Sequence, residues 1–121
     1  KSLKGSKVLL LGMAYKKDID DLRESPALKL MELLKDGGAD LIYHDPYIPQ
    51  IPKVSPMRHY DFVMKSQPLT EELLQSVDVA LIVTDHSDFD YDWIVQHAPL
   101  VVDSRNATSG VKAHRDRIVL A

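Results

Sequence analysis

Cysteine is absent from this sequence of 121 residues, which excludes a disulfide framework, a thiolate metal site and a cysteine nucleophile on the chain itself. No apolar run approaches the roughly 20 residues that cross a bilayer, and the N-terminus has no signal-peptide pattern. An excess of positive charge is missing too, because 15 basic residues against 18 acidic ones give a net charge of -3, whereas nucleic-acid-binding proteins usually have a strongly basic face. These absences predict a soluble, cytoplasmic protein that binds neither membranes nor nucleic acids.

The composition is that of one folded domain. Hydrophobic residues make up 45% of the chain and charged residues 27%, and the length is close to that of a typical domain with one core. We therefore expect residues 1–121 to form a single domain. The chain begins at Lys1, and its last strand-like segment ends beside the C-terminal Ala121, so we interpret it as an excised part of a longer protein.

Uninterrupted apolar runs predict the inner strands of a sheet. Residues 7–12 and 79–83 form two such runs, which suit strands buried on both faces of a parallel sheet. Shorter apolar segments predict further strands at residues 39–44, 100–103 and 118–120. Five prolines from Asp45 to Pro68 predict a long irregular segment there, with one short edge strand near residues 62–64.

Helical signals separate these strands. Ser25 followed by Pro26 predicts the start of a helix, a broad apolar face continues it, and the glycine pair at residues 37–38 ends it. Shorter helices are predicted after the capping residues Thr70 and Asp90. Strands that alternate with helices are typical of an α/β fold, so we predict a doubly wound, mostly parallel sheet with helices on both faces.

Two positively charged side chains follow strands of this predicted sheet. The loop after the first strand, residues 13–24, has twelve residues, whereas a purely structural connection has about two to six. Lys16 lies in this loop, and the N-terminus of the next helix favours an anion at the same place. Arg105 follows the fourth strand and carries a planar guanidinium suited to phosphate oxygens. Because the carboxyl ends of parallel strands share one edge, we expect Lys16 and Arg105 to converge on one anion.

The glycine pattern excludes a dinucleotide site in this domain. The residues after the first strand are Gly-Met-Ala-Tyr at positions 12–15, not the G-x-G-x-x-G sequence that lets a backbone approach a pyrophosphate. We therefore expect a Rossmann-like sheet that does not bind NAD. Asp45 follows the second strand, where an acidic residue can hold a ribose, but Pro46 behind it favours a turn-initiating role.

The remaining polar groups favour structural roles. Three aspartates within residues 18–21 lie among basic residues, which favours an ion-pair network, and we expect Asp21, Arg23 and Ser25 to shape the loop. Five histidines occur without metal-ligand spacing, so we predict no metal site. Thr-Asp-His at residues 84–86 could form a proton relay, but a turn with local side-chain hydrogen bonds is the favoured interpretation.

Four motifs in order resemble those of a known family. The longest runs from Gly12 to Leu28, and the others span residues 43–47, 83–86 and 102–108, which include His-Asp-Pro-Tyr, Thr-Asp-His and Arg-Asn-Ala-Thr. Together they resemble the C-terminal, UDP-binding domain of the UDP-glucose/GDP-mannose dehydrogenase family, over nearly the whole chain. The last three motifs most resemble the branch that acts on UDP-N-acetylglucosamine and related UDP-N-acetylhexosamines.

The resemblance implies one part of a three-part oxidoreductase of polysaccharide biosynthesis. Such enzymes oxidise the C6 alcohol of a UDP-sugar to a carboxylate, with two NAD and a cysteine that this chain lacks. NAD would be bound by an N-terminal domain, and a helical middle region would form much of the contact in a homo-oligomer. The implied partners of this chain are a UDP-sugar and the rest of the dehydrogenase. The isolated chain is expected to be inactive and to carry no catalytic residue.

The resemblance also implies roles for individual residues. Lys16 would contact a phosphate or the adjoining sugar, and Tyr15 would lie beside the nucleotide. Arg105 would contact the diphosphate or lie near the active-site interface. Lys17 replaces a proline that is frequent in the family, so no ligand role is assigned to it.

Two alternatives remain open from the sequence. A signalling receiver domain has the same kind of sheet and an acidic cluster after its first strand. Its phospho-acceptor aspartate ends the third strand, however, where this sequence has Val83 and Thr84 before Asp85. An assembly module without nucleotide binding is the other alternative.

Overall fold

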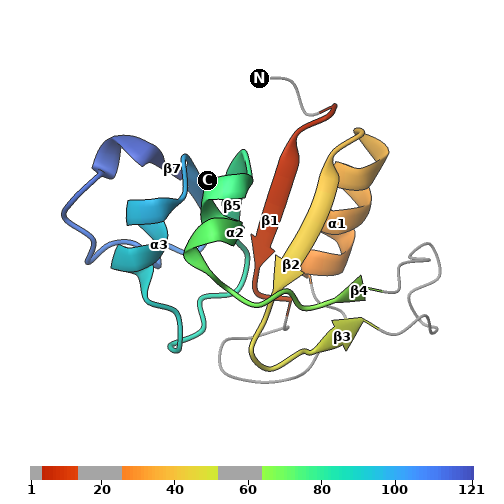
Figure 1. The fold of residues 1–121 in the computed structure, drawn as a ribbon, viewed down its shortest axis with the longest axis horizontal. Coiled ribbons are helices and arrows are strands. Elements are labelled where there is room, and N and C mark those ends of the chain that lie inside the picture. Colours follow the sequence, from red (N-terminus) through yellow and green to blue (C-terminus); the bar gives the residue numbers. More distant parts are fainter. Residues whose placement is uncertain (1–3, 14–25, 52–63) are drawn as a thin grey trace.

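A five-stranded parallel sheet forms the centre of the computed structural model, which describes residues 4–13, 26–51 and 64–121 (Figure 1). In spatial order, its strands are β2 (Asp40–His44), β1 (Lys7–Leu11), β5 (Val79–Ile82), β6 (Val101–Asp103) and β7 (Ile118–Leu120). All neighbouring pairs in this sheet are parallel. The helical elements are α1 (Pro26–Asp36), α2 (Glu71–Ser76), α3 (Tyr91–His97) and a 3-10 turn (Arg115–Arg117).

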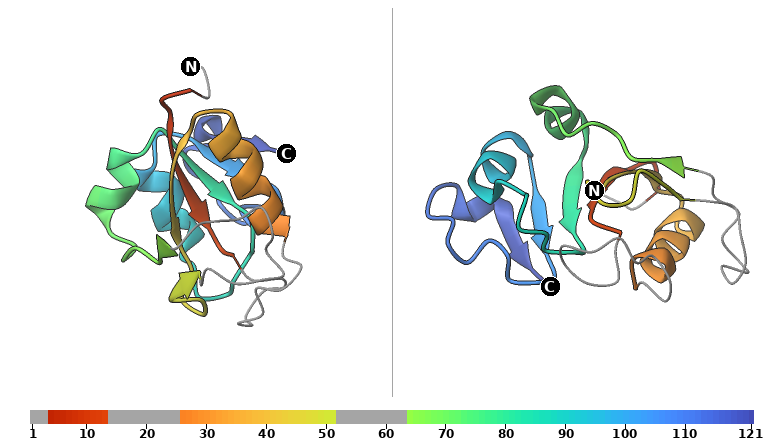
Figure 2. Two further views of the ribbon diagram at one scale, coloured as in Figure 1. Left: turned by 90° about the vertical axis from the view of Figure 1, so that its right-hand side faces the viewer. Right: turned by 90° about the horizontal axis from the view of Figure 1, so that it is seen from below.

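The predicted α/β fold is confirmed. Helix α1 covers one face of the sheet, whereas α2 and α3 cover the other (Figure 2). The strand predicted near residues 62–64 corresponds to β4 (Met64–Lys65), but it pairs antiparallel with β3 (Gln50–Ile51) and not with the main sheet. Residues 62 and 63 lie outside the described residues. Within the described part of the chain, every helix is too short to span a bilayer.

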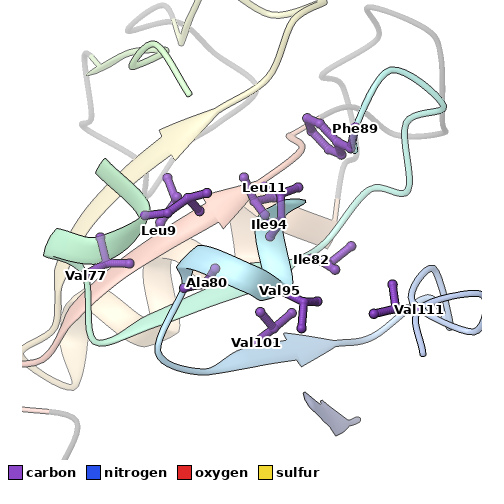
Figure 3. Close-up of a cluster of buried hydrophobic side chains, with 12 residues drawn as sticks. Leu9, Leu11, Val77, Ala80, Ile82, Phe89, Ile94, Val95, Val101 and Val111 are labelled. Carbon is purple, nitrogen blue, oxygen red and sulfur yellow. The ribbon is translucent and has the colours of Figure 1, made fainter. Parts of the chain in front are cut away.

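The position of β1 explains its uninterrupted apolar sequence. This strand lies between β2 and β5. Val8 and Leu10 belong to the buried cluster on the side of α1, whereas Leu9 and Leu11 belong to the cluster on the side of α2 and α3 (Figure 3). Because successive strand residues point to opposite faces, an apolar residue at every position fills both layers. Each fully buried leucine stabilises the fold by about 1.5 to 3 kcal/mol.

Local capping groups set the helix ends. The Thr70 side-chain oxygen accepts a hydrogen bond from the Leu73 N–H (3.1 Å), and the Asp90 carboxylate accepts one from the Trp93 N–H (3.2 Å). Both predicted N-caps are therefore confirmed. After α1, Gly38 adopts a φ of +91°, a left-handed conformation that favours glycine at the end of a helix.

The strand order creates a switch point between β1 and β5. From β1 the chain crosses through α1 to β2, and it returns through α2 to β5 on the other side of β1 (Figure 1). In open parallel sheets, ligands bind outside the carboxyl ends of the strands at such a point. The segments that follow β1 and β5 are therefore the first place to expect a binding site.

Candidate functional site

Gly12 and Thr84 pack against each other where β1 and β5 end. Gly12 has a φ of +92°, and a Cβ atom on it would come within 2.4 Å of the Thr84 Cβ atom, so only glycine fits. The Gly12 N–H donates to the His44 carbonyl (2.9 Å), which joins this turn to the end of β2. The close packing of Gly12 against Thr84 therefore holds the ends of β1 and β5 together.

The Asp45 carboxylate joins the segments that follow three strands. Its Oδ2 atom accepts hydrogen bonds from the Met13 N–H (2.7 Å) and from His86 Nε2 (2.9 Å), and its Oδ1 atom accepts one from the Tyr47 N–H (2.8 Å). Asp45 is 1% exposed and His86 is 0% exposed. Met13 follows β1, Asp45 follows β2 and His86 follows β5. One buried carboxylate therefore ties the continuations of these strands together, and its donors offset the cost of burying its charge.

Aromatic rings hold the His86 side chain in place. The ring centroids of Tyr47 and Phe89 lie 4.7 Å and 5.6 Å from that of His86. The Tyr91 hydroxyl donates to the His86 carbonyl (2.9 Å), and the Tyr47 hydroxyl donates to Asp88 Oδ2 (3.0 Å). Packing and hydrogen bonds thus restrict both the ring and the backbone of His86.

The pKa of Tyr43 is raised by its surroundings, which include Asp45. Burial, followed by the negative charge of Asp45, raises the pKa of Tyr43 from 10.0 to about 12, although a hydrogen bond with the Ser66 backbone acts in the opposite direction. The Tyr43 hydroxyl donates to the Ile48 carbonyl (3.1 Å). Tyr43 therefore stays neutral at physiological pH and acts as a hydrogen-bond donor beside the Asp45 carboxylate.

Asp103 ends β6 and organises the loop that carries Arg105. Its Oδ1 atom accepts hydrogen bonds from the N–H groups of Arg105 (3.0 Å) and Ala107 (3.1 Å). Its Oδ2 atom accepts bonds from the Thr108 N–H (2.8 Å) and the Thr108 hydroxyl (2.6 Å). Burial raises the pKa of Asp103, but these four hydrogen bonds outweigh it and hold the pKa below its ordinary value of 3.8. The charged carboxylate therefore keeps this loop in one shape.

Arg105 lies at the carboxyl end of β5. Its Nε atom donates to the Val83 carbonyl (2.9 Å), and the residue is exposed. Within residues 4–13, 26–51 and 64–121, this is the only hydrogen bond of the guanidinium group, so both terminal nitrogens keep donors for a ligand. A cation is thus fixed beside the switch point by an anchor that does not use its terminal nitrogens.

The other predicted site residues lie outside the described part of the chain. They are Tyr15, Lys16, Asp21, Arg23 and Ser25. The convergence of Lys16 with Arg105 therefore stays a prediction, as do the loop-shaping roles. Among the residues that the structure describes, no group of three or more His, Cys, Asp or Glu side chains could hold a metal ion.

Asp45, Asp103 and His86 form hydrogen bonds in the structure that were not predicted from the sequence. The turn predicted at Asp45 is confirmed by its bond to the Tyr47 N–H, but its contacts with Met13 and His86 were not predicted. Residues 84–86 are predicted to form local side-chain hydrogen bonds. The His86 ring instead bonds to Asp45, which is 41 residues earlier in the chain. No local signal names that partner. No role was predicted for Asp103, and no short motif marks its bonds to Thr108, five residues later.

A family match covers both the switch point and the Arg105 loop. The model described as the UDP-glucose/GDP-mannose dehydrogenase family, UDP binding domain, matches residues 9–110. The chain belongs to this family. Membership replaces the receiver-domain alternative and agrees with the resemblance seen in the sequence motifs.

The relatives of this UDP-binding domain are longer than the chain. A UDP-N-acetyl-D-mannosamine dehydrogenase of Campylobacter jejuni is 37% identical over 91 residues, which cover 74% of this chain and 21% of that protein. The UDP-glucose 6-dehydrogenase AglM of Haloferax volcanii is 31% identical over 106 residues, which cover 85% of this chain and 24% of that protein. The crystal structure of an NDP-N-acetyl-D-galactosaminuronic acid dehydrogenase from Methanosarcina mazei Go1 matches with a TM-score of 0.74 and 27% identity, over 100% of this chain and 25% of that one. The chain thus spans about a quarter or less of these relatives.

Proposed function

We propose that this domain binds the UDP part of a nucleotide sugar for an NAD-dependent UDP-sugar 6-dehydrogenase. The observation that carries the proposal is the anchoring of Arg105 at the end of β5 through its Nε atom. The terminal nitrogens of a guanidinium can form two parallel hydrogen bonds with phosphate oxygens. Family membership supports UDP as the ligand that supplies these phosphates.

The loop after β1 supplies the rest of the proposed site. Lys16 contacts a phosphate beside Arg105, and Tyr15 contacts the nucleotide. Asp21, Arg23 and Ser25 shape this loop. Support comes from the sequence order, because Tyr15 follows Met13 by two residues, and the Met13 backbone is bound to Asp45 at the switch point.

The domain supplies binding energy, and other parts of the protein supply the chemistry. Binding of the UDP tail holds the sugar so that its C6 alcohol meets the reacting groups, and the alcohol is oxidised to a carboxylate. This four-electron oxidation takes up one water molecule and releases two hydrides, for which two NAD bound by another part of the protein would be the acceptors. We assign NAD to an N-terminal domain, because the residues after β1 lack the G-x-G-x-x-G pattern, and the reactive cysteine to another segment, because this chain has none.

The partners of this domain follow from its role in binding without catalysis. The partners of this domain are a UDP-sugar, the rest of the dehydrogenase chain and further copies in a cytoplasmic homo-oligomer. The isolated domain is inactive because it holds neither NAD nor the reactive cysteine. It contributes to the making of oxidised sugar nucleotides for polysaccharides.

The proposed sugar is an N-acetylhexosamine. Support comes from the motifs at residues 44–47, 84–86 and 105–108 and from the relatives of Campylobacter jejuni and Methanosarcina mazei, both named for N-acetylated sugars. The Haloferax volcanii relative is named for UDP-glucose, so the two substrates should be compared directly. The longer protein that carries this domain should form NADH faster with a UDP-N-acetylhexosamine than with UDP-glucose. The reverse order would contradict the choice of sugar.

Calorimetric titration with UDP tests the anion site. Arg105→Ala should weaken UDP binding roughly tenfold to a hundredfold, because a hydrogen bond to a charged group contributes about 1.5 to 3 kcal/mol. Lys16→Ala should have an effect of the same size. Lys35→Ala is the matched control, because Lys35 is in the last turn of α1, next to the start of β2 at the opposite edge of the sheet. Unchanged UDP affinity in both Arg105→Ala and Lys16→Ala would show that the phosphates bind elsewhere. No binding of UDP to the unmodified chain would overturn the proposed function.

A further inference from the structure

The backbone of Met13 is fixed by the side chain of Asp45, which follows β2. Met13 is the last described residue before the segment that carries Tyr15 and Lys16. Its N–H donates to Asp45 Oδ2 at 2.7 Å, and the Met13 side chain is buried. The direction in which the chain leaves β1 therefore depends on where this one carboxylate oxygen is held.

The same oxygen is held by His86. His86 Nε2 lies 2.9 Å from Asp45 Oδ2, and both side chains are fully buried. Because Asp45 Oδ2 accepts hydrogen bonds from both His86 and Met13, displacement of His86 shifts the oxygen to which the Met13 N–H is bound. The Asp45–His86 pair thus couples the segment after β5 to the segment after β1 across the switch point.

Other contacts keep His86 itself from moving. The Tyr47 and Phe89 rings pack against the imidazole, and the Tyr91 hydroxyl binds the His86 carbonyl. The position of Nε2 is therefore also set by Phe89 and Tyr91, which do not depend on the bond to Asp45, and His86 can act as the fixed end of the pair.

We propose that His86 is a positioning residue for UDP binding, acting through Asp45 on the backbone at Met13. The proposal rests on the proposed function of this domain. His86 does not touch the nucleotide. It orients the carboxylate, and the carboxylate orients the Met13 N–H. Met13 precedes Lys16, the phosphate contact of the proposed function, by three residues in the sequence.

Amide hydrogen exchange tests the first half of the coupling without any ligand. In His86→Leu, exchange at the Met13 amide should speed up at least tenfold, whereas exchange at the amides of Leu9 and Leu10 in β1 should change less than threefold. His97→Leu is the matched control, because His97 Nδ1 also pairs with a carboxylate, that of Glu71 (3.1 Å), but joins α2 to α3. Equal exchange at Met13 in His86→Leu and in the unmodified protein would overturn the proposal.

Calorimetric titration with UDP tests the second half. His86→Leu should weaken UDP binding about tenfold, because the hydrogen bond that orients Asp45 is lost. His86→Gln places an amide N–H near the position of Nε2 and should restore affinity to within threefold, whereas the shorter side chain of His86→Asn should not. If His86→Leu does not fold, the contrast between the Gln and Asn variants carries the test.

The outcomes separate this inference from the proposed function. If the unmodified chain does not bind UDP, the proposed function fails, and the positioning role fails with it. If the unmodified chain binds UDP and the Leu, Gln and Asn variants bind it equally well, only the positioning role of His86 is overturned. If His97→Leu weakens binding as much as His86→Leu does, the effect is general loss of stability and the positioning role is overturned.

Discussion

Asp45 and Asp103 stand at the carboxyl ends of β2 and β6, and both are 1% exposed. They differ in where their donors come from. Asp103 binds three N–H groups and a hydroxyl from residues no more than five positions away. Asp45 binds one N–H group from two residues away, but also Met13, 32 positions away, and His86, 41 positions away.

The difference shows that a buried carboxylate can organise either one loop or a whole sheet edge. The Asp103 loop needs only a short segment to close, so its hydrogen bonds cost little chain entropy. The Asp45 contacts require β1, β2 and β5 to be side by side already. Loss of Asp103 should therefore disturb the surroundings of Arg105, whereas loss of Asp45 should disturb the whole edge of the sheet.

Asp45→Ala should have the largest effect on stability. The N–H groups of Met13 and Tyr47 and the His86 imidazole would lose an acceptor in a buried place, at about 1 to 3 kcal/mol for each unsatisfied group. We expect the free energy of unfolding in urea to fall by about 4 kcal/mol. Asp88→Ala is the control, because Asp88 is exposed and accepts from the Tyr47 hydroxyl, and it should cost about 0.5 kcal/mol. Equal losses of unfolding free energy in Asp45→Ala and Asp88→Ala would show that the buried contacts of Asp45 do not stabilise the edge of the sheet.

Asp103→Asn should have an intermediate effect that depends on pH. At neutral pH we expect a loss of about 2 kcal/mol, because the amide nitrogen cannot accept the hydrogen bonds of an oxygen. The pKa of Asp103 is lower in the folded protein than its ordinary value of 3.8. The stabilisation by the charged Asp103 is therefore complete above pH 3.8. As the pH falls below 3.8, the carboxyl group is protonated first in the unfolded chain, and the stabilisation is lost as the pH approaches the folded-state pKa.

Urea unfolding at neutral and acidic pH checks this expectation. Asparagine does not titrate, so the difference in unfolding free energy between the unmodified protein and Asp103→Asn should narrow as the pH falls below 3.8. A difference that stays the same throughout this range would show that the negative charge of Asp103 does not hold the loop.

Thr108→Val should have the smallest effect. It removes the hydroxyl that donates to Asp103 Oδ2, while the Thr108 N–H and the other two donors remain. Because three of the four hydrogen bonds persist in the same loop, we expect a loss of about 1 kcal/mol in thermal unfolding. UDP affinity should stay within twofold. A loss as large as that of Asp45→Ala would show that the Asp103 loop supports more of the fold than its local contacts indicate.

Much of the fold was predictable because its signals are local. The apolar run of β1, the N-caps Thr70 and Asp90 and the glycine after α1 each depend on a few consecutive residues. The position of Arg105 at the shared edge was also predictable, because it follows a parallel strand. The part played by His86 was not, because nothing near it in the chain indicates Asp45 as its partner.

Short stretches of sequence were enough to specify the strands, the helix caps, the turn at Asp45 and the cation after β6, since apolar runs and capping groups act over a few positions. The assembled sheet was needed to bring His86 to Asp45 and Thr84 to Gly12. These contacts exist because β1 is inserted between β2 and β5, and that order places distant segments within hydrogen-bonding and van der Waals range.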